Sequence, residues 1–143
     1  MAFSFFKKNK EEKKDTSSSL HYYALEVSEI VNETKDAISI SFKQPDTKID
    51  YKSGQFLTLI VPVKGKEVRR AYSLCSSPFT DSDLTVAVKR VDNGLMSNWL
   101  PDNLKVGDAI RIMEPMGVFT TEYSASNKRH LILFAGGSGI TPM

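Results

Sequence analysis

The sequence has little cysteine, little net charge and no long apolar run. Cys75 is its only cysteine, which excludes an internal disulfide or a cysteine-rich metal site within these 143 residues. The formal net charge of +2 is too small to indicate nucleic acid or an anionic membrane as a partner. No apolar stretch is long enough to span a bilayer, and the N-terminus has no apolar segment typical of a secretory signal. We therefore predict a cytoplasmic protein that binds neither nucleic acid nor membrane, with Cys75 as a packing residue.

What the sequence does contain is an ordinary globular composition, with 41% hydrophobic and 25% charged residues. Residues 1–19, which include "KKNKEEKKDTSSS", predict a disordered leader; the alternative is a weak surface-binding tail through Phe3, Phe5 and Phe6. Between residues 20 and 122, short alternating stretches are separated by turn residues, which is typical of an antiparallel barrel or sandwich. The six predicted strands cover residues 22–31, 36–42, 55–63, 68–76, 83–91 and 108–115.

One segment, "DNGLMSNWLPDNL", interrupts the strands with an Asn-Gly turn signal and apolar residues at helical spacing. It predicts a short helix that begins near Gly94. The N–H groups of Leu95, Met96 and Ser97 would then be free donors at a helix start, where amides and the helix dipole bind anions. An ordinary capped helix that plugs the barrel with Trp99 explains the same residues, and the two roles are compatible.

A second pattern with chemical meaning lies in the predicted strand 68–76. Strand alternation places Arg70 and Tyr72 on one face and Ser73 on the other. A tyrosine ring can stack on a flat ligand ring, an arginine can hold phosphate oxygens in a fork, and a serine can bond a ring nitrogen. Lys89 and Arg90 would add positive charge nearby. The pattern indicates a ligand with a flat ring and a phosphate; a surface arginine, a rim tyrosine and a turn serine are the alternative.

Residues 129–143, "RHLILFAGGSGITPM", have a different pattern, in which a continuous apolar run leads into a glycine-rich turn. Continuous apolar runs suit strands that are covered on both faces, as in a parallel sheet. We therefore predict the first strand and glycine-rich loop of a truncated α/β nucleotide-binding domain. The turn lacks the lysine of a P-loop, which argues against phosphoryl transfer.

Three motifs, in this order along the chain, resemble the ferredoxin-NADP reductase superfamily. They are Arg-x-Tyr-Ser at 70–73, Gly-x-x-Ser at 94–97 and Gly-Gly-Ser-Gly-Ile-Thr-Pro at 136–142. The stretches "RRAYSLCSSP", "VAVKRV", "SNWL" and "PMGVF" are most similar to the oxygenase-reductase branch, to which the phenylacetyl-CoA epoxygenase reductase subunit belongs. The resemblance implies an all-β fold: a six-stranded antiparallel Greek-key barrel with one short helix over residues 20–122, followed by the first strand of an α/β NAD(P)-binding domain.

The resemblance also implies FAD as the cofactor and assigns its contacts. Tyr72 would stack on the isoalloxazine with Ser73 near its N5, and these two are the candidate catalytic residues. Arg70 would bind the pyrophosphate together with Met96 and Ser97. No metal ligand is expected in these residues. The other implied contacts are Ala71, Ala87, Val88, Lys89 and Leu95, with Ser138 and Thr141 where flavin and nicotinamide meet.

The reaction implied by the resemblance is hydride transfer from NAD(P)H to the flavin, followed by single-electron transfer to an iron–sulfur centre or an oxygenase-type acceptor. Members of that branch carry a [2Fe–2S] domain after the nicotinamide domain. This chain alone is expected to be inactive with NAD(P)H because it stops at the start of the nicotinamide domain. The alternatives are a non-catalytic flavin- or nucleotide-binding barrel or interaction module, and a siderophore or cytochrome b5-type reductase without an iron–sulfur domain.

Overall fold

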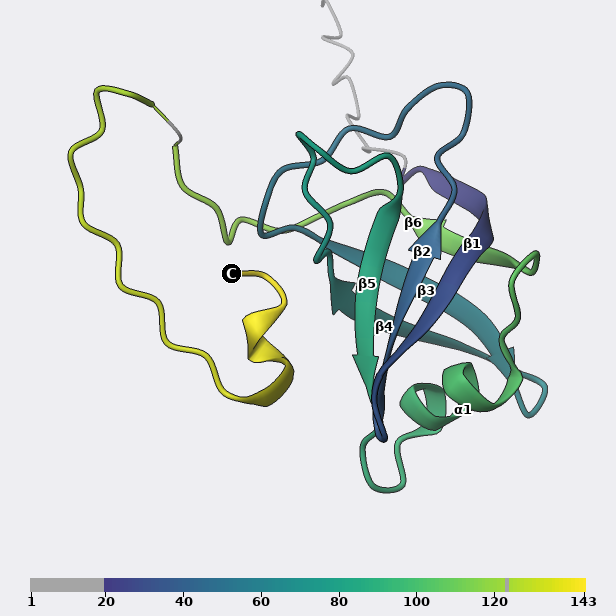
Figure 1. Ribbon diagram of the computed structural model, residues 1–143. Coiled ribbons are helices and arrows are strands. Elements are labelled where there is room, and N and C mark those ends of the chain that lie inside the picture. Colours follow the sequence, from purple (N-terminus) through teal and green to yellow (C-terminus); the bar gives the residue numbers. More distant parts are fainter. Residues whose placement is uncertain (1–19, 123) are drawn as a thin grey trace, which may run out of the picture.

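The structure is a computed structural model that describes residues 20–122 and 124–143 (Figure 1). The predicted leader, residues 1–19, lies outside the described residues. Strands make up most of the regular structure of the described chain, together with one α-helix and a short 3-10 turn. The elements are β1 (Tyr22–Thr34), β2 (Ala37–Phe42), β3 (Phe56–Val63), β4 (Lys66–Ser73), β5 (Leu84–Lys89), α1 (Leu95–Asn103), β6 (Ala109–Met113) and η1 (Gly137–Ile140).

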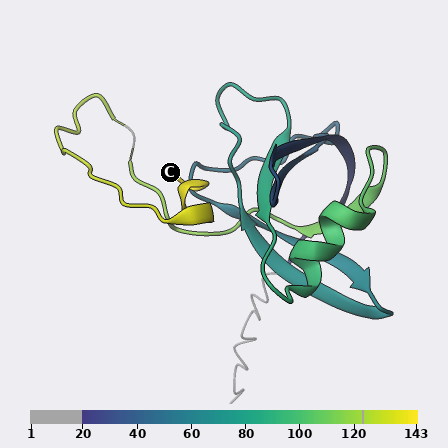
Figure 2. The same ribbon diagram turned by 60° about the horizontal axis from the view of Figure 1, so that its bottom comes forward.

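The six strands form one antiparallel sheet in the order β4-β3-β6-β1-β2-β5, which curls into a barrel (Figure 2). The two edge strands meet beyond the end of β4, where Leu74 bridges Val86 and the Cys75 N–H donates to the Thr85 carbonyl at 2.9 Å. This junction places β2, β5, β4 and β3 side by side, which is a Greek-key order. The predicted antiparallel Greek-key barrel with one helix is therefore confirmed.

Strand alternation builds the core. In β2, Ile38, Ile40 and Phe42 point inward and are buried, while the residues between them are half-buried. Each such side chain stabilises the fold by about 1.5–3 kcal/mol when it is fully removed from water. The same alternation explains Cys75: Leu74 before it is buried, so Cys75 faces outward and is exposed. The prediction that Cys75 is a packing residue is therefore wrong.

The hairpin between β3 and β4 is tighter than predicted. Lys64 and Gly65 have positive φ angles of 50° and 74°, and Val63 pairs with Lys66 immediately beyond them. A two-residue turn of this kind follows the natural twist of the strands, so β4 begins at Lys66 and not at Val68. The early start fixes the register of β4 and with it the face on which its later residues lie.

Helix α1 lies across one end of the barrel (Figures 1 and 2). Met96 and Leu100 are buried in the core, and Trp99 packs against it from one side. The helix begins after Gly94 as predicted but continues past Pro101 to Asn103. A proline here removes one backbone bond, and the burial of Leu100 keeps the last turn packed on the barrel. In the part of the chain that the structure describes, no helix combines the length and apolar character needed to cross a membrane.

After β6 the chain leaves the barrel, runs outward and returns to place η1 beside β5 (Figure 1). Residues 129–136 form no strand, so the strand predicted at the start of the 129–143 segment is not formed in this structure. A strand depends on a neighbour that completes its hydrogen bonds, and no described residue pairs with this segment. Its apolar side chains stay exposed; Ile132 is 71% and Phe134 87% accessible.

Candidate functional site

Two residues of β4 lie on the inner face of the sheet but are not buried, and they mark the site. Across the ladder, Tyr72 pairs with Leu57 and Arg70 with Leu59, so all four side chains lie on the inner face of the sheet. Leu57 and Leu59 are fully buried, whereas Arg70 is exposed and Tyr72 is half-buried. The reason is that β4 and β5 do not pair along their length. Among the described residues, the two strands are linked only by the Leu74 bridge just after β4, and no ladder joins β4 itself to β5. Core-facing positions of β4 therefore open into a gap in the barrel wall.

A cleft of about 510 Å³ occupies this gap. β4 forms one wall, β5 the other, and the turn that leads into α1 closes one end. Sequence reasoning did not place Val91 and Asn93 in the site, because a turn residue carries no signal of what lies opposite it. The predicted site residues that line the cleft are Arg70, Ala71, Tyr72, Ala87, Lys89, Leu95, Met96, Ser97 and Ser138.

Three predicted site residues do not line the cleft. Ser73 pairs with Phe56 and lies on the outer face of β4, half-buried. Val88 has a fully buried side chain in the core, so it can reach a ligand only through its backbone. The Thr141 hydroxyl donates to the Ser138 carbonyl at 3.0 Å, within the glycine-rich turn. Ser73 thus lacks direct geometric support for its predicted role at the flavin N5.

The electrostatics of the cleft favour an anion. The Arg70 guanidinium donates through Nη1 to the Arg69 carbonyl at 2.7 Å, and no carboxylate of the described residues pairs with it. Arg69, on the opposite face, is bound to Glu67 at 2.7 Å. Lys89 is 3.7 Å from Asp36, a long contact between two exposed groups. Arg70 is therefore the cation that is best placed to hold phosphate oxygens.

Tyr72 supplies the flat surface of the cleft. Its ring packs against the edge of the core and is half-buried. Burial raises the pKa of its phenol above the ordinary value and outweighs the opposite effect of the Arg70 charge. The phenol therefore stays neutral at physiological pH and presents an uncharged aromatic face to a ligand ring.

The turn into α1 leaves little room for a side chain at position 94. A Cβ on Gly94 would lie 2.2 Å from the Ser97 Oγ and 3.0 Å from the Val91 carbonyl oxygen. The turn is already closed by the Gly94 N–H, which donates to that carbonyl at 2.8 Å, and by the Val91 N–H, which donates to the Ser97 Oγ at 3.3 Å. No side chain caps the start of α1, so its first amides remain available to an anion in the cleft.

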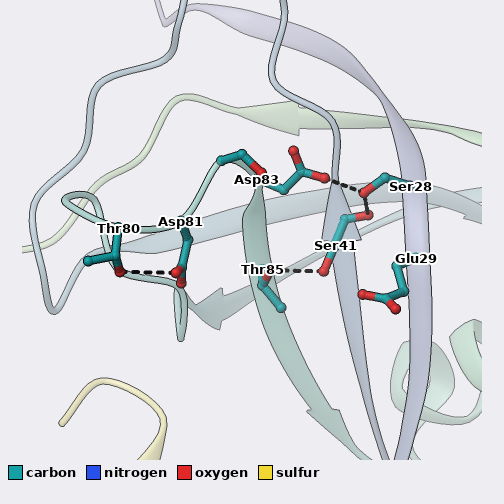
Figure 3. Close-up of a pocket in the computed structure, with 8 residues that line it drawn as sticks. Ser28, Glu29, Ser41, Thr80, Asp81, Asp83 and Thr85 are labelled. Atoms are coloured by element: carbon teal, nitrogen blue, oxygen red, sulfur yellow. Dashed lines mark hydrogen bonds between the residues drawn. The ribbon is translucent and has the colours of Figure 1, made fainter.

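A larger hollow of about 580 Å³, shown in Figure 3, lies on another part of the barrel. Its polar groups bond to one another: Ser28 donates to Asp83 at 2.5 Å, and Ser41 and Thr85 share a bond of 2.9 Å. Two further carboxylates line it, which is the wrong charge for a phosphate ligand. Within residues 20–122 and 124–143, no group of three or more His, Cys, Asp or Glu side chains is arranged to hold a metal ion. The β4–β5 cleft is therefore the candidate site.

Comparison with known proteins identifies the family of this chain. A family model described as "Oxidoreductase FAD-binding domain" matches residues 23–121, well over half of the chain. The chain belongs to this FAD-binding domain family. The resemblance to ferredoxin reductases is thereby confirmed, and FAD is the cofactor that the family binds.

Relatives of this FAD-binding domain include components of oxygenase systems. The ferredoxin reductase component of 3-ketosteroid-9-alpha-monooxygenase from Rhodococcus rhodochrous is 47% identical over 123 residues, which are 83% of this chain and 34% of the relative. One component of the 1,2-phenylacetyl-CoA epoxidase from Escherichia coli is 34% identical over 125 residues, 85% of this chain and 35% of that component. The chain thus spans about a third of the length of the curated relatives that it matches.

Solved structures give the same picture for this FAD-binding domain. Phthalate dioxygenase reductase, described as a modular structure for electron transfer from pyridine nucleotides to [2Fe–2S], superposes with a TM-score of 0.70 at 30% identity. That match covers 85% of this chain and 37% of the reductase. The Amycolatopsis cytochrome P450 reductase GcoB gives a TM-score of 0.75 at 28% identity, covering 86% of this chain and 37% of the other.

The residues of the cleft fit FAD. Its volume is within the range of about 300–1,000 Å³ that is usual for ligand pockets. The neutral Tyr72 ring suits the isoalloxazine, and Arg70 with the uncapped start of α1 suits the phosphates. Gly94 keeps side-chain atoms out of the turn at that end.

Proposed function

We propose that this chain is the FAD-holding part of a flavin-dependent reductase. The whole protein would take electrons from NAD(P)H and pass them singly to an iron–sulfur centre or an oxygenase-type acceptor. The observation that carries the proposal is the β4–β5 cleft, which combines an aromatic ring, an arginine that pairs with no carboxylate of the described residues and a helix start without a side-chain cap. The relative that is named as the ferredoxin reductase component of a monooxygenase supports the choice of acceptor.

Bound FAD would supply the redox chemistry, because it accepts two electrons as hydride and releases them one at a time. The chain's own residues bind and orient it. Tyr72 covers one face of the ring and excludes water from it, and Arg70 holds the pyrophosphate. The role of Ser73 near the reactive ring atom stays a prediction from the sequence.

The proposed division of the chain is a FAD-binding domain over residues 20–122 and the start of an NAD(P)-binding domain over 129–143. Ser138 lines the cleft from η1, which supports a meeting point of flavin and nicotinamide there. Thr141 would stabilise that turn through its bond to the Ser138 carbonyl. A [2Fe–2S] cluster in a further domain belongs to the same proposal, and the cytoplasmic location stays a prediction.

The reductase proposal is tested by extending the chain beyond Met143 with the remainder of a nicotinamide-binding domain, so that residues 129–143 supply its first strand and glycine-rich loop. We expect the extended chain to oxidise NADH or NADPH with ferricyanide as acceptor, whereas the FAD-loaded chain alone stays close to the rate of free FAD. Binding of FAD and binding of the nicotinamide nucleotide are each measured separately by fluorescence. An extended chain that binds both and still leaves its flavin oxidised would contradict the reductase and favour a non-catalytic flavin carrier.

Changing Tyr72 to alanine should weaken FAD binding by about 0.5–1.5 kcal/mol beyond the lost contact area, the typical value of an aromatic pair. Tyr72→Phe keeps the ring and should bind FAD as tightly as the parent chain. Both affinities are obtained from quenching of flavin fluorescence. Equal affinity of the alanine and phenylalanine variants would remove the ring from its proposed role.

A further inference from the structure

Asn98, in the first turn of α1, holds the turn that precedes the helix from the side opposite the cleft. Its side-chain Nδ2 donates two hydrogen bonds, to the Val91 carbonyl at 2.9 Å and to the Gly94 carbonyl at 2.7 Å. Asn98 does not line the FAD cleft; it faces a separate depression on the other side of the turn. One side chain therefore ties both ends of the 91–94 turn to the helix without touching the ligand space.

Arg90 lies on the oxygen side of this amide. Arg90 donates through Nη1 to the Asn98 carbonyl oxygen at 3.4 Å and to its Oδ1 at 3.5 Å. Its Nη2 is bound to Asp102, one turn further along the helix, at 2.6 Å. A guanidinium can only donate, so it selects the oxygen side of the amide and leaves the Nδ2 side for the turn.

The direction of the carbonyls decides what the turn presents to a phosphate. Carbonyl oxygens repel an anion, while the amides at a helix start attract it. The two bonds from Asn98 direct the Val91 and Gly94 carbonyls toward Asn98, which does not line the cleft. We infer that Asn98 is a positioning residue for FAD: it keeps the turn in the arrangement in which amides, and not carbonyls, face the pyrophosphate. This inference rests on the proposed binding of FAD.

The test compares two asparagines of the same helix. Asn103 donates from Nδ2 to the Trp99 carbonyl at 2.8 Å, the same kind of bond to the residue four positions earlier, but at the far end of α1 and outside the cleft. Asn98→Ala should lower the affinity for FAD by a factor on the order of ten, the effect of losing two neutral hydrogen bonds. Its affinity for riboflavin, which has no phosphate, should not change, and Asn103→Ala should bind both as the parent chain does.

Asn98→Ser provides an intermediate variant, because a helical serine can still donate to the carbonyl four residues earlier, here that of Gly94. Its FAD affinity should lie between those of the parent and the alanine variant, again with unchanged riboflavin binding. If Asn98→Ala does not fold, the affinities of Asn98→Ser for FAD and for riboflavin test the positioning role instead. Unchanged FAD affinity, or an equal loss for riboflavin, would overturn the positioning role. Failure of the parent chain to bind FAD would instead overturn the proposed function.

Discussion

Replacing Arg70 with alanine is expected to weaken FAD binding by about 1.5–3 kcal/mol, roughly 10- to 150-fold in Kd, the range for a hydrogen bond to a charged group. The expectation follows from the position of the guanidinium. Arg70 lies on a core-facing position of β4 that opens into the cleft, and no described carboxylate neutralises it. The measurement is a titration with FAD that follows quenching of flavin fluorescence.

Arg69→Ala is the matched control for this prediction. Arg69 carries the same charge one residue earlier but lies on the opposite face, bound to Glu67 and 5.9 Å above the Tyr22 ring. Its removal changes the net charge equally and should leave FAD affinity unchanged. Riboflavin gives a second check, since neither variant should lose affinity for a flavin without phosphate. Equal losses of FAD affinity in the two variants would show that Arg70 acts through general charge alone.

Gly94→Ala is expected to lower the free energy of unfolding by about 1–3 kcal/mol and to weaken FAD binding at the same time. The φ of Gly94 is −66°, so the effect is steric and does not come from backbone strain. The new Cβ would lie 2.2 Å from the Ser97 Oγ and 3.0 Å from the Val91 carbonyl oxygen. Ser97 can escape only by turning its hydroxyl away, which leaves the Val91 N–H without its acceptor.

Gly136→Ala is the control for the steric argument. Its φ is −123°, and no heavy atom lies within 4 Å of the position that a Cβ would take. Urea unfolding followed by circular dichroism should therefore give the parent stability for Gly136→Ala and a reduced one for Gly94→Ala. Parent-like stability and FAD affinity in Gly94→Ala would mean that the turn tolerates a side chain and does not need close packing.

Much of the barrel follows from local patterns. Period-two alternation predicted a strand over 36–42, and the structure buries the alternate residues Ile38, Ile40 and Phe42 of β2. The Asn-Gly signal predicted where α1 begins. The end of α1 does not follow from a local pattern: the helix continues past Pro101 to Asn103, because packing of Leu100 outweighs the local effect of the proline. Local sequence favours or disfavours an element, but burial against distant strands decides how far it extends.

The opening of the site could not be predicted in the same way. Alternation placed Arg70 and Tyr72 on one face, but that face is the inner one, and it is exposed only because β5 does not pair with this part of β4. Such a gap is a property of two strands that are separated in the sequence. Asn98 was missed for a related reason: its partners are carbonyl groups, which carry no sequence signal. The apolar segment at 131–134 shows the converse, since a strand-like sequence without a neighbouring strand forms no ladder.

The central claim is that the β4–β5 cleft holds both the ring and the pyrophosphate of FAD. It is tested most directly by titrating the purified chain with FAD and with FMN, while circular dichroism verifies that the same sample is folded. The account predicts quenching of flavin fluorescence by a tight FAD complex and much weaker binding of FMN, which lacks the second phosphate. A folded chain that binds neither flavin, or that binds FMN as tightly as FAD, would contradict it.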